Sequence, residues 1–503
     1  MAVTKLSRQV TNRMTATSGH QRVTRGASAA PALIGVGVFL LVGLTWAGLV
    51  LPNPSVHGYL GLAIIALSLA ALAADSITGR LGPLSLTFWS FMAVWTGFAP
   101  LYQFTTGRLP WIDVPATELY PLAQLLTLGA AIAYRVGQVS ANHRKPRTPF
   151  QTAVPRTFLG GFLLPLLAFP LAALSGVSLA SRFQSRDELI AAYAAQGLEY
   201  GDGGGALLGV LKTLPICITA VGLYLVVYEI KRRRRIGEKI RLPLLIALTF
   251  AGAAAVTFAN PLSNSRFQGF SAALMLLFVL VSFKTVFKRT LLSLGLVVGL
   301  LVAYPLSAVF KNEVIASRVY FRPEIFLSVD FDGFQQTVNA IWYVQHSGHT
   351  LGYHLVSALG FFIPRSIWDG KALPASYPVA ESRGYTFQNL ALPLWAEMYV
   401  EFGVIGMLLV FFLIARYSRR ADLAFTDSGS TRLAIVTPVL AAVQIGLLRG
   451  PLGAQVVFAG TCVALAVVLT RRENPPDVFS RNAPTSSEAN KRLRVVRGGG
   501  IPR

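Results

Sequence analysis

Two arginines occupy positions where a charge is expensive. Arg266 follows the turn 260–265 between two hydrophobic runs, and Arg449 lies in the hinge 448–451 between the last two. Arginine at the centre of a membrane helix costs about 2.5–3.5 kcal/mol on insertion scales. A guanidinium binds a phosphate through two parallel N–H bonds. Together with Arg365, the pair predicts a shared anion site, although each arginine alone is also explained by a side chain that reaches the lipid headgroups.

Candidate acids and bases follow in the same half of the chain. Glu397 and Glu401 are four residues apart, which puts them on one face of a helix. They fit carboxylates at a favourable helix N-terminus, a general base, or a group that holds an arginine in place. A lone histidine is more often packed than catalytic, but a base of this kind would activate a sugar hydroxyl. The remaining candidates are His346, His349, His354, Asp330 and Asp332.

Most of these groups lie in the segment 311–392, which is far longer than the other gaps between hydrophobic runs. It carries six Lys/Arg against six Asp/Glu. A loop this long inside a packed protein is usually functional or disordered, and its aromatic content argues against disorder. Apolar residues at helical spacing predict an amphipathic helix over 334–347. Trp368, close to Arg365, fits either stacking on a sugar or the interfacial aromatic belt.

The elements that position these residues are membrane helices. The chain is 53% hydrophobic and 13% charged, and its mean hydropathy is +0.55. A span needs about 20 apolar residues, so the composition predicts an all-α polytopic membrane protein. The expected spans are twelve: 32–51, 57–74, 84–104, 119–139, 157–180, 206–230, 242–259, 267–287, 290–310, 393–415, 432–449 and 452–470.

The placement of the basic residues predicts the orientation. The net charge of +23 is concentrated in alternate gaps, which is the positive-inside pattern. Topology and anionic lipid headgroups explain this charge better than nucleic acid does. Both termini are then cytoplasmic and the segment 311–392 is extracytoplasmic. The basic clusters are the N-terminus, 144–147, 231–235, 288–289, 416–420 and the tail from Arg471.

The chain therefore divides by composition. Two basic, Ser/Thr/Pro/Gly-rich tails are expected to be disordered. No cleavable signal peptide is apparent before the first span. Cys217 and Cys462 fall within spans, and no nucleotide, dinucleotide or metal-ligand spacing is found, so neither a cofactor nor a metal is expected. The expected regions are the tail 1–30, nine spans in 31–310, the large loop 311–392, three spans in 393–470 and the tail 471–503.

Several stretches resemble the O-antigen polymerases, or oligosaccharide repeat unit polymerases. The match covers roughly residues 250–455, and the N-terminal half matches only as hydrophobic spans. Its most specific piece is Phe-Ile-Pro-Arg-x-Ile-Trp followed by Glu-x-Tyr-x-x-Phe-Gly-x-x-Gly. The run 369–372 departs from the family pattern, so Lys371 is carried over less firmly than Arg365. The matching segments are NPLSNSRF (260–267), FFIPRSIWDGK (361–371), PLWAEMYVEFGVIG (393–406) and LLRG (447–450).

The resemblance implies a membrane-embedded glycosyltransferase on the outer face of the bacterial plasma membrane. Such enzymes transfer a growing glycan from one polyprenyl diphosphate to a sugar hydroxyl of the next lipid-linked unit. A chain-length regulator and a flippase are the partners implied. Because breaking the glycosyl bond needs charge neutralisation, arginines are the expected diphosphate ligands. The expected diphosphate-binding residues are Arg266, Arg365, Arg449, Arg383 and Arg322; the catalytic candidates are Glu397, His349 and His354; the sugar-binding candidates are Trp368 and Trp395.

Two other functions fit the same sequence. An O-antigen ligase has similar chemistry and a similar outer loop, but it transfers the glycan to a lipid core or a protein. A twelve-span flippase would show paired halves and polar or broken helices at mid-membrane. In this chain the polar groups gather near one expected face, which favours the enzyme.

Overall fold

The computed structural model describes residues 30–52, 54–111, 116–141, 152–196, 205–307, 323–388, 390–427 and 431–473. The expected disordered tails lie almost wholly outside these ranges, as do residues 311–322 of the large loop.

Eight helical segments in the described residues are long and apolar enough to cross a membrane, which indicates a multi-pass membrane protein. Each coincides with an expected span. They are Ala30–Val50 (α2, Ala30–Thr45, with η1, Trp46–Val50), Val56–Thr78 (α3), Pro83–Thr106 (α4, Pro83–Phe91, with η2, Met92–Phe98, and α5, Ala99–Thr106), Thr117–Ser140 (η3, Thr117–Leu119, with α6, Tyr120–Ser140), Leu211–Arg235 (in α9, Gly205–Arg235), Val286–Leu306 (α12, Val286–Val298, with η6, Gly299–Ala303, and α13, Tyr304–Leu306), Leu394–Thr426 (in α17, Leu394–Asp427) and Arg432–Arg449 (α18).

The other four expected spans are shorter apolar helices of 15 to 17 residues. A 15-residue helix is roughly 22 Å long, less than the hydrocarbon thickness of about 30 Å. The shorter helices are Leu159–Ala173 (η4 with α7, Leu164–Ala173), α10 (Leu242–Phe258), α11 (Arg266–Leu280) and α19 (Leu452–Val468).

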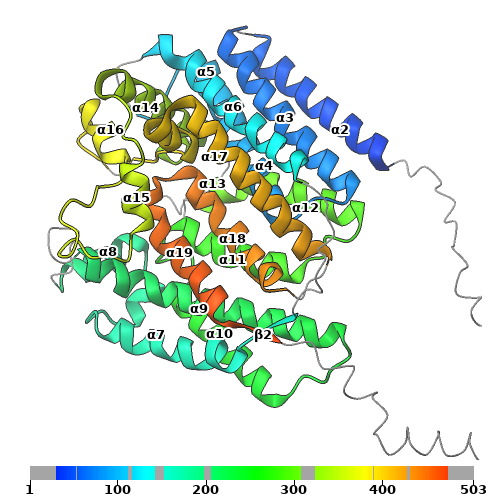
Figure 1. The fold of residues 1–503 in the computed structure, drawn as a ribbon, viewed down its shortest axis with the longest axis vertical. Helices are drawn as coiled ribbons and strands as arrows, with labels where there is room; N and C mark the ends of the chain where they lie inside the picture. The colour runs from blue at the N-terminus through cyan, green and yellow to red at the C-terminus, as the bar shows by residue number, and fades with distance from the viewer. Residues whose placement is uncertain are drawn as a thin grey trace, which may run out of the picture.

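Short elements gather on the side of the molecule opposite the start of α2, as Figure 1 shows for α8, α14, α15 and α16. We call this side the loop face. The expected amphipathic helix is present as α14, which buries Phe334, Val338 and Ile341. The elements of this face are η5 (Ala180–Phe183), α8 (Arg186–Ala194), η9 (Pro323–Leu327), η10 (Val329–Phe331), α14 (Gly333–Ser347), α15 (Tyr353–Leu359) and α16 (Ser376–Ser382).

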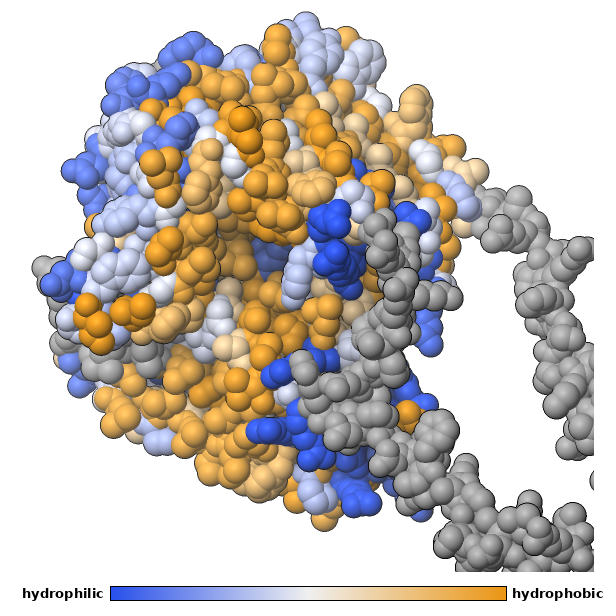
Figure 2. Space-filling view, viewed as in Figure 1, coloured by the Kyte–Doolittle hydropathy of each residue, from blue (hydrophilic) through white to orange (hydrophobic). Residues whose placement is uncertain are grey.

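The opposite side, where α2 begins, is called the basic face because it holds the residues 232–235 that end α9. An antiparallel ribbon there pairs β1 (Thr152–Pro155) with β2 (Thr470–Glu473), which the sequence did not predict. Figure 2 shows apolar surface over most of the view, with hydrophilic residues at upper left and lower right. Leu33, Phe39 and Leu44 of α2 are 68%, 76% and 70% exposed, as expected for side chains that face lipid.

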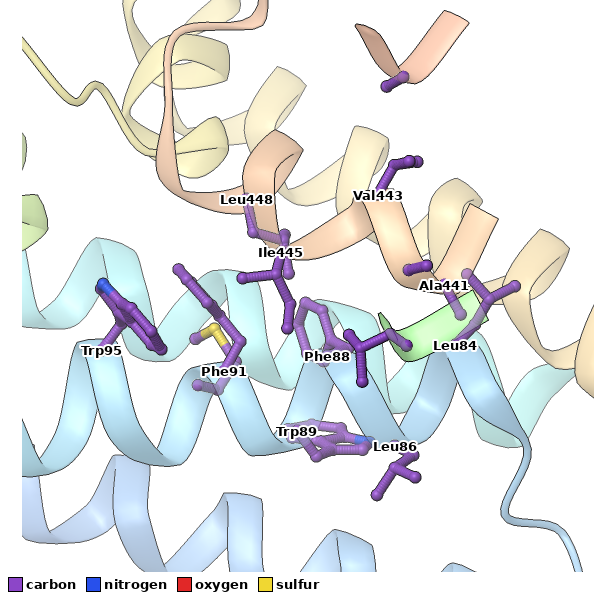
Figure 3. Packing of buried hydrophobic residues seen from close by; sticks show 14 of the residues in the cluster. Leu84, Leu86, Phe88, Trp89, Phe91, Trp95, Ala441, Val443, Ile445 and Leu448 are labelled. Carbon is purple, nitrogen blue, oxygen red and sulfur yellow. The ribbon is translucent and has the colours of Figure 1, made fainter. Parts of the chain in front are cut away.

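The core is formed where α4 and η2 (Met92–Phe98) pack against α18 (Figure 3). Phe91 stacks on Trp95 at 5.2 Å, and Phe88 stacks on Tyr134 of α6 at 3.5 Å. Packing of this kind, rather than water exclusion, holds helices together in a bilayer. At Gly137 a Cβ would lie 2.3 Å from the Phe412 carbonyl oxygen, so glycine lets α6 and α17 approach closely.

Helix α17 is interrupted nine residues after it begins. Gly403 adopts φ 67° and ψ −168°, a conformation that other residues rarely adopt. The interruption leaves carbonyl groups of the preceding turn without helical partners. Two of them accept from the connector between α14 and α15: Thr350 N–H donates to Val400 O at 3.1 Å, and Leu351 N–H to Glu401 O at 2.9 Å. The break thus joins the loop face to the membrane helices.

A buried carboxylate joins the same helix to α4 near the basic face. Asp422 accepts from the backbone N–H groups of Leu84 and Ser85, both at 2.9 Å, and from Ser85 Oγ at 2.6 Å. It therefore supplies from α17 the cap that α4 lacks, because Gly82 at the N-cap has no side chain. Asp75 nearby accepts from Arg135 and Arg419 at 3.0 and 2.8 Å.

We expect Asp422→Ala to destabilise the protein by about 1–3 kcal/mol, because it leaves buried N–H groups without an acceptor. Asp422→Asn keeps one acceptor oxygen and should lose less. Thermal unfolding in detergent, followed by tryptophan fluorescence, measures the difference, with exposed Arg420→Ala of the same helix as the control. An Asp422→Ala variant as stable as the control would refute this role of the cap.

Candidate functional site

Arg266 and Arg449 meet on one carboxylate at the loop face. Arg266 begins α11, Arg449 ends α18, and both reach Asp330 in η10. Arg266 forms an ion pair with Oδ2 of Asp330, and Arg449 Nη2 lies 3.6 Å from Oδ1. Arg449 also donates through Nε to the Asp330 carbonyl at 3.0 Å and through Nη2 to that of Val329 at 3.2 Å. Two turns that are distant in sequence thus share one anionic group.

Aromatic rings form the floor of this cluster. The Arg266 guanidinium lies over Tyr304 at 5.3 Å and that of Arg449 over Phe267 at 4.8 Å. Trp95 Nε1 donates to the Asp330 carbonyl at 2.9 Å. The two arginine side chains are only 14% and 17% exposed. In such surroundings a charge interacts more strongly than it does in water.

Two buried asparagines shape the turn that precedes Arg266. Asn260 Oδ1 accepts from the backbone N–H groups of Leu262 and Ser263 at 3.0 and 3.1 Å. Its Nδ2 donates to the carbonyl of Arg182 at 3.0 Å, while Asn264 Nδ2 donates to the carbonyls of Phe258 and Asn260. The side chains thus replace backbone partners in a tight turn, which is the usual role of asparagine there.

Glu397 holds the turn on the other side of Arg449. Its Oε2 accepts from the Leu452 N–H at 2.7 Å and so caps the start of α19. Glu397 and Glu401 are both 0% exposed. Within the described residues, Glu397 Oε1 and both carboxylate oxygens of Glu401 have no hydrogen-bond partner. Of the alternatives open from the sequence, the contacts favour a carboxylate that positions the arginine through the backbone of its turn.

Asp330 and Asp332, which were equal candidates from the sequence, have different contacts in the structure. Asp332 is buried and accepts from Trp111 Nε1 at 2.8 Å and Gln336 Nε2 at 3.3 Å. Burial raises the pKa of Asp332 to about 6, although the positive charge of Arg449 opposes the rise. Its Oδ1 has no partner among the described residues. A carboxyl group with such a pKa is suited to accept a proton near neutral pH.

Arg365 is not part of the arginine pair. It is exposed and donates to the carbonyls of Lys371 and Ala372 at 2.6 and 3.2 Å. Lys371 donates in turn to the carbonyls of Gly360, Phe361 and Ile363. A Cβ at Gly360 would lie 2.8 Å from the ring of Trp368, so the tryptophan packs on its own loop. These residues fold the segment 360–372 back on itself.

The other expected site residues are dispersed. Arg383 lies over the ring of Trp342 at 4.5 Å, and Arg322 lies outside the described residues. Trp395 is 1% exposed and donates to Thr337 Oγ1 at 3.1 Å, which leaves it no free face for a sugar.

The two candidate histidines, His349 and His354, lie apart from the arginine pair in their contacts. His354 is buried, with Nδ1 2.8 Å from the Leu373 carbonyl. His349 is exposed and packs edge-on against Tyr399 at 5.6 Å, close to Gly403. Among the described residues, no hydrogen bond, ion pair or ring contact joins either histidine to the arginine pair, whereas Asp332 lies within reach of the Arg449 charge.

An apolar cavity that the sequence did not predict adjoins Arg266. Its volume is about 510 Å³. Small residues line it along α10 and α11, and Tyr304 and Arg266 lie at its polar part. The signal in the sequence was the run of alanines and glycines on adjacent helices, which sequence alone does not distinguish from close helix packing. The small and apolar lining residues are Ala220, Leu223, Ala255, Val256, Ala259, Gly269, Ala272, Ala273, Leu276 and Ala303.

The sequence also offers a candidate cover for the site, the segment 181–205, whose glycines would act as hinges. The segment begins with a fully buried Arg182, which donates to the Tyr193 hydroxyl at 2.5 Å. Its α8 helix starts with a capping box between Ser185 and Glu188. The glycine-rich part, 197–204, lies outside the described residues.

Comparisons with known proteins give no relative: no family model, no curated protein and no solved structure matches the chain.

The raised pKa of Asp332 has a consequence for stability. The folded protein retains a proton between pH 4 and 6 that the unfolded chain releases, so this contribution to stability is greatest below pH 4 and is lost as the pH rises through 6. The ionised group then destabilises the folded state by roughly 3 kcal/mol, from about two pKa units at 1.36 kcal/mol each. The melting temperature of Asp332→Asn should therefore rise relative to that of the wild type as the pH increases from 4 to 7. Exposed Asp369→Asn is the control, and a constant gap across this range would contradict the burial argument.

Proposed function

We propose that this chain is a membrane-embedded, metal-independent glycosyltransferase that polymerises lipid-diphosphate-linked oligosaccharide units on the outer face of the bacterial plasma membrane. One observation carries the proposal: Arg266 and Arg449 converge on Asp330, and Arg266 also lines an apolar cavity. A cationic group beside an apolar cavity fits an amphiphile with an anionic head.

The charges of the cluster favour a phosphate ligand. Two guanidinium groups face one carboxylate, Asp330. Each guanidinium can bind phosphate oxygens through paired N–H donors. A diphosphate would take over the donors that Asp330 now shares, and the polyprenyl chain would lie along the cavity lined by α10 and α11. The same donors would stabilise the diphosphate as its charge develops during bond cleavage.

The transfer itself needs one proton acceptor. The acceptor hydroxyl oxygen forms a bond to C1 of the donor sugar, while the bond from C1 to the diphosphate oxygen breaks and its electron pair leaves with the diphosphate. The hydroxyl proton passes to a carboxylate. Asp332 is the first candidate because its Oδ1 has no partner among the described residues and its pKa is about 6. Glu397 is the second, because it lies at the Arg449 turn.

The orientation follows from charge. The basic face carries residues 231–235 and Arg416, Arg419 and Arg420, so it is assigned to the cytoplasm and the loop face to the exterior. With the four shorter helices also crossing, the chain has twelve spans and both termini are cytoplasmic. The arginine cluster then faces the compartment in which lipid-linked units are polymerised.

Purified protein in vesicles with labelled lipid-linked units tests the proposal. A ladder of longer glycans without any ion gradient supports a polymerase. Transfer only to an added lipid core would identify a ligase instead. The break in α17 at Gly403 resembles the interrupted helices of transporters, so a flippase is the second candidate. Movement of labelled lipid without new glycosidic bonds would establish it.

Arg266→Lys and Arg449→Lys should each reduce chain growth by on the order of tenfold to a hundredfold, because lysine keeps the charge but loses the paired donors. The ladder assay in vesicles measures the loss at matched protein levels. Arg420→Lys, exposed on the basic face, is the control of the same type. Full activity in both site variants would refute the diphosphate clamp.

Filling the apolar cavity should weaken binding of the polyprenyl chain of the donor and not of its sugar. Ala273 lines the cavity and is exposed, so Ala273→Trp adds bulk without disturbing the core. We expect KM for a long-chain polyprenyl donor to rise about tenfold, since each displaced CH2 contact contributes about 0.8 kcal/mol. A short-chain donor should be less affected. Leu280→Trp, on the same helix and 62% exposed outside the cavity lining, is the matched control. Equal effects on both donors would argue against a lipid groove.

A further inference from the structure

A second cavity lies at the loop face among the ends of three helices. It is about 460 Å³ and adjoins the start of α3, the end of α5 and the start of α6. Small-molecule sites in proteins typically measure about 300–1,000 Å³. None of the expected site residues lines it. Its polar lining consists of Ser55, His57, Gln103, Thr105, Arg108 and Thr117.

Gln103 lines the cavity, and one acceptor atom of its side chain has no hydrogen-bond partner among the described residues. The side chain is 1% exposed, and its Nε2 donates to the carbonyls of Phe326 and Phe331 at 2.8 and 2.9 Å. These two carbonyls accept only, so they fix which end of the amide carries the nitrogen. The opposite atom, Oε1, has no partner in the described part of the chain, and neither has His57 Nδ1. A buried acceptor without a donor destabilises a protein unless a ligand supplies one.

Aromatic rings form the apolar walls of the cavity. The rings of His57 and Phe104 are 5.3 Å apart, and Tyr120 lies 6.0 Å from His57 and 6.1 Å from Phe104. Flat apolar walls with a few convergent polar atoms are typical of sites for small polar molecules. The three rings come from three different membrane helices, so the walls are held by the membrane core of the protein.

The unpartnered atoms of Gln103 and His57 indicate the class of ligand. Gln103 Oε1 needs a hydrogen-bond donor, which a phosphate dianion and a hydrocarbon chain both lack. Arg108, which also lines the cavity, is exposed and can donate to an oxygen of a ligand. Hydroxyl donors on a ring with apolar faces are the chemistry of a sugar.

We propose that this cavity, called the Gln103 pocket, binds a sugar of the lipid-linked oligosaccharide. This inference rests on the proposed function for the identity of its ligand. Gln103 donates to the carbonyls of Phe326 and Phe331. Asp330, which lies between these two residues in the chain, forms ion pairs with both arginines. The Gln103 pocket and the arginine pair thus contact one short segment, 326–331. A sugar in the pocket and a diphosphate at the arginines would belong to neighbouring parts of the substrates.

The test measures binding of two probes to the purified full-length chain in nanodiscs. One probe is the oligosaccharide released by mild acid from lipid-linked units of the host cell, and the other is polyprenyl diphosphate without sugar. Gln103→Leu should weaken oligosaccharide binding about tenfold or more, since it removes the acceptor. Because it also frees the segment 326–331, a second variant is needed. Thr117→Trp fills the pocket from an exposed position and should give the same loss.

The matched control is Glu118→Trp, the exposed neighbour that does not line the pocket, and its oligosaccharide affinity should equal that of the wild type. Polyprenyl diphosphate should bind Thr117→Trp as it binds the wild type. Unchanged oligosaccharide binding in Thr117→Trp would overturn the pocket, even if the protein polymerises glycans. Pocket-dependent oligosaccharide binding without chain growth would overturn the polymerase and leave the pocket standing.

Discussion

The pairing of two arginines with Asp330 is the constraint on which the loop face depends. Arg266 and Arg449 are largely withdrawn from water beside apolar helices, where an isolated charge is unfavourable. Asp330 can neutralise only one of them. The segment that carries it must therefore be fixed against the membrane helices, which Trp95 and Gln103 achieve by donating to its carbonyls. The remaining positive charge gives the cluster its attraction for an anion.

The interruption of α17 is the second feature that fixes the loop face to the membrane helices. A continuous helix would satisfy the carbonyls of Val400 and Glu401 internally, and the connector between α14 and α15 would have no partner there. With Gly403 in a left-handed conformation, the connector binds these carbonyls instead. Glu397, one turn earlier, caps α19 and fixes the chain just after Arg449. The first turns of α17 thus connect the α14–α15 connector with the arginine turn.

The sequence predicted the parts of this arrangement that depend on local pattern. Hydropathy located every apolar helix, and periodicity located α14, because both depend on neighbours within one element. Arg266 and Arg449 stood out because charge is rare beside spans. Sequence could not choose Asp330 over Asp332, since their separation depends on which one meets residues more than 60 positions away. The same holds for the ribbon between β1 and β2, whose strands are over 300 residues apart. Arg365 failed for a different reason, because its charge alone does not distinguish an anion ligand from a side chain that donates to carbonyls of its own loop.

The proposed function requires the protein to bind an amphiphile at a membrane surface. The two cavities differ in chemistry and fit different parts of such a molecule. An apolar cavity among α9, α10 and α11 suits a hydrocarbon chain, and a pocket lined by Gln103, His57 and Thr117 suits hydroxyl groups. Arg266 borders the first, and Gln103 belongs to the second. The segment 326–331 contacts both residues, so a shift of this short stretch would change the proposed lipid, phosphate and sugar positions together. Rigid support from Trp95 and the two arginines opposes such a shift and keeps the three positions in register.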